Sequence, residues 1–251
     1  MGKVVSGSKN PMFTDIMLQD TVEQGGRTCT YLGVFGKTLI LVVIAIASAF
    51  IGIPLLGNAG LLGGFFVASL LLAFVFAIVG RLSVNLAPFC SIAYSVCEGI
   101  ALGVLTALLE LVFPGIGFAA IASTFAVVLV MAFLYMTGIV KASQKLKAFV
   151  ITSLFAVLIV NLIIIIANLA GNAYLFELFY GNSMFGLIIA VLVAVVAALS
   201  LVLDFDYATR LVEGEAPKKY EWSASLGLMV GIVYLYIRIL RILIIVFSRR
   251  N

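Results

Sequence analysis

Seven apolar stretches determine what this chain can fold into. Each is close to the roughly 20 residues that an α-helix needs to cross a bilayer. Hydrophobic residues make up 64% of the chain and charged residues only 10%, whereas a soluble domain has about 25% charged residues. We therefore predict an all-α, polytopic membrane helix bundle with seven transmembrane helices. The stretches are 32–56, 60–80, 88–112, 116–139, 149–170, 184–206 and 223–247.

A polar segment precedes the first apolar stretch. Residues 1–31 contain turn-forming pairs, Asn10-Pro11 and Gly25-Gly26, and no apolar signal-peptide core. We expect this segment to form a cytoplasmic amino-terminal arm and the first helix to act as its own insertion signal. Residues 32–251 then form the transmembrane domain, with short linkers between the helices.

The distribution of basic residues predicts the orientation of the helices. Cytoplasmic loops of membrane proteins carry an excess of Lys and Arg, and the loops at 57–59, 113–115 and 171–183 contain neither. The amino terminus and the ends of helices two, four and six are therefore expected in the cytoplasm. The supporting residues are Lys3, Lys9, Arg27, Lys37, Arg81, Lys141, Lys145, Lys147, Arg210, Lys218 and Lys219.

The seventh stretch departs from this pattern. Arg238, Arg241, Arg249 and Arg250 lie toward its far end, which seven spans would place outside the cytoplasm. Either the six preceding helices force the last one across, or the segment is re-entrant and returns to the cytoplasm. A length of about 25 apolar residues is sufficient to cross, which favours the spanning alternative.

Three of the acidic residues within the apolar stretches are candidates for function. Asp204 and Asp206 lie where the sixth helix is predicted to end, and Glu98 lies near the middle of the third. Carboxylates in a bilayer are costly and indicate function by default, so the functional interpretation is an ion pathway or a proton site. The structural alternative is a solvated helix end for the two aspartates. For Glu98 it is a protonated side chain hydrogen-bonded to a neighbouring helix.

Two arginines need partners of their own. Arg81 lies at the cytoplasmic end of the second helix, where it pairs with an aspartate of the sixth helix or snorkels as an interfacial anchor. Arg238 lies about 15 residues into the seventh helix, or roughly 22 Å from its start. A guanidinium at that depth requires a carboxylate, a water-filled cavity or the outer interface, and the residue pattern assigns Arg238 no single role.

Small residues predict where helices approach one another. Gly99 and Gly103 in the third helix, and Gly227 and Gly231 in the seventh, form two GxxxG motifs. Such motifs allow close contact between helix backbones. We therefore expect helices three and seven to pack tightly in the bundle.

Several function classes are not supported by the residues. The chain has no histidine, and its three cysteines, Cys29, Cys90 and Cys97, are too few for a disulfide framework. No nucleophile motif, metal-ligand spacing or phosphate-binding glycine loop is present, and the basic residues are loop anchors. We expect no enzyme activity, cofactor, metal centre or nucleic-acid partner, and the lipid bilayer is the expected partner.

Several segments together resemble the Bax inhibitor 1/YccA-like family, the transmembrane Bax inhibitor motif proteins, and in particular its bacterial branch. The resemblance covers nearly the whole chain and is most specific at its two ends. The segments are Asn10-Pro11-Met12-Phe13, Gly36-Lys37-Thr38, Tyr94-Ser95-Val96-Cys97-Glu98-Gly99, Asp204-Phe205-Asp206-Tyr207, Glu221-Trp222, and Leu235-Tyr236-Ile237-Arg238-Ile239-Leu240-Arg241.

The resemblance implies a seven-helix bundle with the last helix near its centre and, in some members, a pH-sensitive calcium leak. In those members an aspartate of helix six pairs with one of helix seven, and an arginine of helix two can latch onto the former. By position, Asp206 matches the helix-six acid, with Asp204 as second choice. Arg81 matches the latch arginine, and Glu98 matches the Glu-Gly of helix three.

The chain departs from the family pattern on helix seven. No acid occurs between Ser223 and Asn251, and Arg238 stands where members of this branch often carry a glutamate. Two hypotheses follow: a pH-sensitive cation (calcium) leak channel, or a non-channel interaction protein. The second would modulate a membrane AAA protease or a stress response through the amino-terminal arm.

Asp204 and Asp206 cannot both face one partner. Residues two apart on a helix are separated by about 200°. On the family match we expect Asp206 to face the bundle and Arg81, and Asp204 to face another helix, the headgroups or cytoplasmic water.

Overall fold

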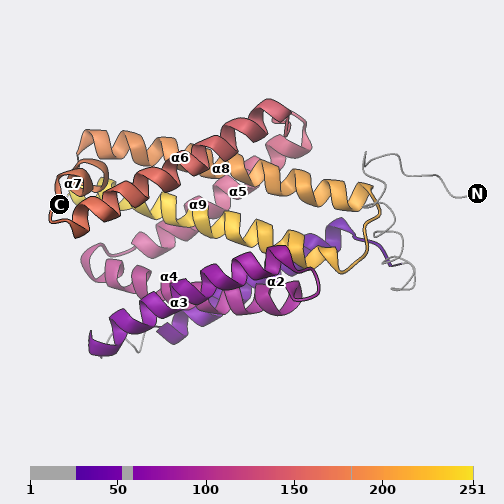
Figure 1. The fold of residues 1–251 in the computed structure, drawn as a ribbon, viewed down its shortest axis with the longest axis horizontal. Helices are drawn as coiled ribbons and strands as arrows, with labels where there is room; N and C mark the ends of the chain where they lie inside the picture. The colour runs from indigo at the N-terminus through magenta and orange to yellow at the C-terminus, as the bar shows by residue number, and fades with distance from the viewer. Residues whose placement is uncertain (1–26, 53–58, 182, 251) are drawn as a thin grey trace, which may run out of the picture. The chain divides into compact units, whose positions relative to one another are not determined.

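The computed structural model describes residues 27–52, 59–181 and 183–250 (Figure 1). Most of the predicted amino-terminal arm lies outside these residues. The described chain is helical, with one isolated β-bridge between Thr28 and Pro217. The helices are α2 (Tyr31–Gly52), α3 (Ala59–Leu82), α4 (Ala87–Val112), α5 (Ile116–Met136), α6 (Gln144–Leu169), α7 (Tyr174–Tyr180), α8 (Met184–Glu213) and α9 (Tyr220–Arg250).

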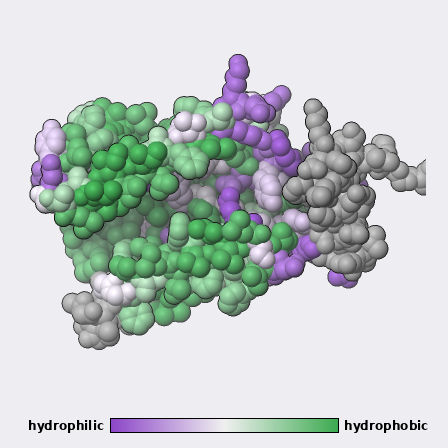
Figure 2. Space-filling view, in the orientation of Figure 1, coloured by the Kyte–Doolittle hydropathy of each residue, from purple (hydrophilic) through white to green (hydrophobic). Residues whose placement is uncertain are grey.

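Seven of these helices are long and apolar enough to span a membrane, which confirms the prediction for each of the seven stretches. Hydrophobic residues cover most of the visible surface of the helices (Figure 2). Large apolar side chains are exposed on α3, α5 and α6, where Phe74 is 66%, Phe125 63% and Phe155 61% exposed. Exposed apolar surface of this kind requires lipid rather than water as its surroundings.

The main differences from the predicted stretches concern α8, α6 and α7. α8 continues to Glu213, so the two aspartates lie within a helix rather than at its end. α6 begins at Gln144, because the side chain of Ser143 accepts a hydrogen bond from Leu146 N at 3.2 Å and caps the helix. The short helix α7 occupies the predicted loop 171–183, and Asn172 Oδ1 accepts a hydrogen bond from Tyr174 N at its start.

The chain divides into two compact units. The first unit comprises the described residues of Met1–Leu105 together with Asp204–Val230, and the second comprises Thr106–Leu203 and Gly231–Asn251. α4, α8 and α9 each contribute residues to both units. The predicted transmembrane domain, residues 32–251, thus contains two units. Each unit combines two segments that are separate in the sequence.

The first part of α9 lies at the centre of the first unit. Every residue from Ser223 to Met229 is buried, as expected of a helix that is surrounded by protein on all sides. Ser225 Oγ donates to Val34 O on α2 at 2.8 Å, and Ser91 Oγ of α4 donates to Trp222 O at 3.4 Å. The prediction of a central last helix is confirmed for this unit.

The first GxxxG motif brings α4 against α2. A Cβ atom added at Gly99 would overlap Ala45 and Ser48, and one added at Gly103 would overlap the backbone of Ala49. Only glycine permits this approach between the helix backbones. The expectation that the third transmembrane helix packs tightly is confirmed, and its neighbour at this motif is the first transmembrane helix.

In the second unit, side chains close the turns between helices. Glu110 of α4 accepts hydrogen bonds from Gly115 N at 2.5 Å and Gly117 N at 3.0 Å. Gly115 has a φ of 84°, a left-handed conformation that favours glycine. The carboxylate thus satisfies amide groups at the start of α5, where the helix dipole favours a negative charge.

Candidate functional site

Glu98 lies in the interior of the first unit, near the middle of α4. Only 6% of the residue is exposed, and the described chain offers it no ion pair. Tyr94, one turn earlier and also buried, is close enough to interact electrostatically with Glu98 and Arg81. Ser95 Oγ is buried without a hydrogen-bond partner among the described residues. The structure thus gathers several polar groups along one helix in an apolar unit.

Arg81 of α3 forms an ion pair with Asp204 of α8. The distance from Arg81 Nη2 to Asp204 Oδ1 is 3.4 Å, and the side chains are 53% and 17% exposed, respectively. Gly227 of α9 leaves the space for this pair, because a Cβ atom there would lie 3.1 Å from Nη2 and 3.3 Å from Oδ1. The second predicted GxxxG motif therefore contributes its first glycine to a charged contact.

The prediction that Arg81 pairs with Asp206 is wrong, because the partner of Arg81 is Asp204. Leu201, Ala208 and Leu211 are buried, and Asp204 shares their side of α8 because it lies three or four residues from Leu201 and Ala208. Asp206 Oδ2 instead lies 2.8 Å from Nε of Arg210, one turn further along the same helix. The family match by position selected the other acid, since the two are only two residues apart.

A second ion pair, which the sequence analysis missed, joins the starts of α2 and α9. Glu221 is completely buried and its carboxylate contacts Lys37 Nζ. Glu221 Oε1 also accepts hydrogen bonds from Thr30 N at 3.0 Å and Thr30 Oγ1 at 3.2 Å. A Cβ atom at Gly33 would overlap the same carboxylate. We call this arrangement of Thr30, Gly33, Lys37 and Glu221 the Glu221 cluster.

The sequence carried a signal for the Glu221 cluster. Lys37 and Glu221 have opposite charges, and both lie near the predicted cytoplasmic ends of their helices. By sequence, however, Lys37 resembles an ordinary interfacial lysine, and Glu221 is notable only as part of the family resemblance. The signal for the pair is therefore the opposite charge of two residues at helix ends on the same side of the membrane.

Cys29 lies next to the Glu221 cluster, just before α2. Its thiol donates to Pro217 O at 3.2 Å, and its backbone amide donates to Ala216 O at 2.7 Å. Burial, and then the negative charge of Glu221, raise the pKa of this thiol to about 12. Cys29 therefore acts as a packing residue at neutral pH, not as a nucleophile.

Arg238 and Arg241 of α9 are held differently, both within the second unit. The guanidinium of Arg238 lies 4.7 Å from the centroid of the Tyr234 ring, and its Nε is buried with no hydrogen-bond partner in the described chain. Arg241 binds the carbonyl groups of Tyr180 and Gly181 at the end of α7. Carbonyls at a helix end attract a cation, so α7 supplies for Arg241 a partner that the sequence did not indicate.

Among the described residues, no cluster of three or more His, Cys, Asp or Glu side chains is arranged to hold a metal ion. Glu98, Asp204 and Glu221 of the first unit lie in separate places. Glu98 stands in mid-helix on α4, Asp204 contacts α3, and Glu221 contacts α2. The structure brings Arg81 together with one of the predicted acids and leaves Glu98 and Asp206 apart from that pair.

Comparison with known proteins places this arrangement in a family. The family model for Bax inhibitor 1-like proteins matches residues 10–248. Comparisons with curated proteins and with solved structures each gave no match. The family match reaches into all seven membrane helices and includes the two interhelical ion pairs described above. The chain belongs to the Bax inhibitor 1-like family.

Proposed function

We propose that this protein is a pH-sensitive cation leak of the membrane, with calcium as the cation to test first. The observation that supports this best is the Arg81–Asp204 ion pair. It places a carboxylate of low exposure against a guanidinium that is half exposed, in a helical unit that is otherwise largely apolar. While Arg81 remains paired, the two side chains close the proposed pathway between α3 and α8. Carboxylate oxygens are preferred calcium ligands, and Glu98 offers one elsewhere in the same unit.

Protonation of Asp204 supplies the proposed pH response. A neutral carboxyl group loses its attraction for Arg81, and the half-exposed arginine then has access to water. The groups that face Asp204 are Arg81 from α3 and the glycine backbone of α9 at Gly227, with Tyr94 of α4 close to Arg81. In this mechanism, acid releases the latch, and Glu98 supplies a further carboxylate along the pathway.

Calcium flux into liposomes that contain the purified full chain tests the proposal. We expect flux above that of empty liposomes, rising as the pH falls. Asp204→Asn should remove the pH dependence, because the amide no longer titrates. Asp206→Asn is the matched control and should retain it, since Asp206 pairs with Arg210 on its own helix. Flux equal to that of empty liposomes at every pH would overturn the leak.

The absence of an acid on α9 beyond Glu221 favours a second candidate. Without that acid, the pair of carboxylates on helices six and seven cannot form. The protein would then be an interaction partner that modulates a membrane AAA protease or a stress response through residues 1–31. Loss of the protease phenotype on deletion of the arm, together with absent flux, would support this alternative.

We also propose an inner-membrane location with a cytoplasmic amino terminus. Arg27, Lys37, Lys218 and Lys219 line one pocket at the starts of α2 and α9, and basic residues are retained on the cytoplasmic side. Cysteine labelling in a cysteine-free background checks the orientation. A cysteine at position 145 should label from the inside only, and ready labelling from the outside would contradict this orientation.

A further inference from the structure

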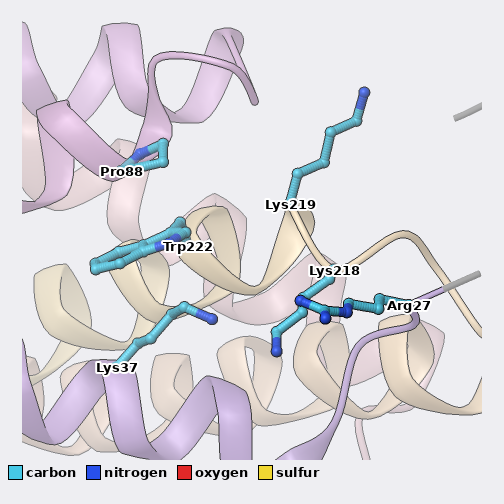
Figure 3. Close-up of a pocket in the computed structure, with 6 residues that line it drawn as sticks. All are labelled: Arg27, Lys37, Pro88, Lys218, Lys219 and Trp222. Atoms are coloured by element: carbon cyan, nitrogen blue, oxygen red, sulfur yellow. The ribbon is translucent and has the colours of Figure 1, made fainter. Parts of the chain in front are cut away.

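A basic pocket in the first unit is not used by the proposed leak. It has a volume of about 560 Å³ and lies where α2, α4 and α9 begin. Four of its six lining residues are cations, and none is acidic. Figure 3 shows the charged ends of Lys37, Arg27 and Lys218 directed toward one open space, while Lys219 extends away from it. The lining residues are Arg27, Lys37, Pro88, Lys218, Lys219 and Trp222.

The backbone fixes the position of two of these cations. Lys218 N donates to Arg27 O at 3.1 Å, beside the antiparallel bridge between Thr28 and Pro217. These main-chain contacts hold Arg27 and Lys218 next to each other. Within the described residues, neither side chain has a carboxylate within ion-pair distance. Two like charges are thus held side by side without an acid between them, which favours an anionic ligand.

The base of the pocket is rigid and partly apolar. Lys37 Nζ lies 5.4 Å from the centroid of the Trp222 ring, and the same ammonium group is anchored by Glu221. Trp222 and Pro88 provide flat apolar surface beside the charges (Figure 3). A ligand that fits has a compact negative group for the cations and an apolar part for this surface.

We propose that this pocket binds the phosphate group of an anionic phospholipid. Basic pockets between membrane helices on the cytoplasmic side are suited to acidic lipid headgroups, and tryptophan favours the same level of the bilayer. Phe89, which follows Pro88, and Leu86, two residues before it, are 66% and 50% exposed. They offer the acyl chains an apolar surface next to the pocket, which a free phosphate would not use. This proposal does not depend on ion conduction.

Trp222 provides a direct test, because it is the only tryptophan in the chain. The full chain is placed in phosphatidylcholine vesicles to which brominated phosphatidylglycerol or brominated phosphatidylcholine is added in equal amounts. Bromine quenches tryptophan fluorescence at short range. We expect stronger quenching by the brominated phosphatidylglycerol. Equal quenching by the two lipids would overturn the proposal.

Variants of the lining residues test whether the preference for phosphatidylglycerol arises from this pocket. Arg27→Gln and Lys218→Gln should each reduce the preference for phosphatidylglycerol about fivefold, and the double variant should abolish it. Their main-chain hydrogen bonds remain, so the helical content should not change. Lys141→Gln with Lys145→Gln is the matched control, because it removes two exposed charges from the second unit. An unchanged preference in the double variant, or an equal loss in the control, would contradict the assignment.

A soluble competitor distinguishes the two sources of phosphate. Glycerol phosphate added to the vesicles should leave the lipid preference unchanged, because it lacks the acyl chains. If glycerol phosphate removes the preference, the pocket is a site for free phosphate compounds and the lipid assignment is wrong. Calcium flux is measured in the same vesicles as a separate test of the proposed leak. Loss of the lipid preference with intact flux, or the reverse, would show which of the two proposals fails.

Discussion

The two interhelical ion pairs of the first unit differ in how their charges are held. In the Glu221 cluster the carboxylate is fully buried and receives two hydrogen bonds from Thr30 in addition to Lys37. In the other pair, Asp204 meets Arg81 through one contact of 3.4 Å, and the arginine is half exposed. A buried charge with several partners is costly to break, whereas a partly solvated one breaks readily. The first pair is therefore expected to contribute more to stability, and the second is the one suited to the switching that we propose.

A glycine also leaves space for the charged side chains of each pair. Gly33 faces the Glu221 carboxylate, and Gly227 faces the Arg81–Asp204 contact. The carboxylate at Gly33 is fixed by its partners, but Arg81 has solvent into which it can move. Gly33 therefore makes room for a rigid ion pair, whereas Gly227 makes room for a pair whose arginine can move.

The largest effect is expected from Glu221→Gln. The amide leaves Lys37 without its counter-charge beside a buried site, and breaking a buried pair by removing one partner costs about 3–5 kcal/mol. Thermal denaturation in detergent measures the loss of stability. The double variant Lys37→Met with Glu221→Met should recover much of it, because two apolar side chains leave no charge uncompensated. A loss below about 1 kcal/mol for Glu221→Gln would place this pair in the class of exposed salt bridges.

The next largest effect is expected from replacing the two glycines by alanine, and it should differ between them. Gly33→Ala should destabilise the protein by about 1–3 kcal/mol, as expected for overpacking, because the added methyl group overlaps a carboxylate that cannot move. Gly227→Ala should cost less, since Arg81 can swing toward solvent, and it should raise any calcium flux by separating the pair. Equal destabilisation with unchanged flux would show that the two sites are equally rigid.

A smaller effect is expected from the Arg81–Asp204 pair itself. A double-mutant cycle on Arg81→Ala and Asp204→Asn should give a coupling of about 0.5–1 kcal/mol, at the lower end for groups in contact. The control cycle with Asp206→Asn should be additive, because Asp206 contacts Arg210. A larger coupling of Arg81 with Asp206 than with Asp204 would support the Arg81–Asp206 pair that the family match suggested.

The sequence predicted the helices better than their contacts. Uninterrupted apolar length is a local property, so the seven membrane helices could be located without knowing what they touch. The short helix α7 could not, because its seven residues fall below that length signal and Asn172 at its start resembles an ordinary turn.

The candidate site was predicted in part. Arg81, Glu98 and Asp204 were selected because charge in an apolar stretch is conspicuous. The choice between Asp204 and Asp206 depended on the rotation of α8 about its axis, which its seven additional residues and its buried face determine. Glu221 was missed because it precedes the apolar run of its helix and looks like an ordinary acid at a helix start.

The smallest effect concerns Cys29, whose thiol reports on the Glu221 cluster without disturbing it. Its pKa is raised to about 12 by burial and by the charge of Glu221, so at neutral pH very little of the reactive thiolate is present. With Cys90 and Cys97 replaced by serine, we expect iodoacetamide to label Cys29 very slowly and the rate to rise with pH up to at least pH 10. Glu221→Gln should accelerate the labelling, because it removes the charge that disfavours the thiolate and weakens the contacts that bury it. Arg81→Ala should leave the rate unchanged, since Arg81 acts on the other ion pair. Acceleration by Arg81→Ala as large as that by Glu221→Gln would mean that the two pairs open together, and the division between a stabilising pair and a switching pair would be wrong.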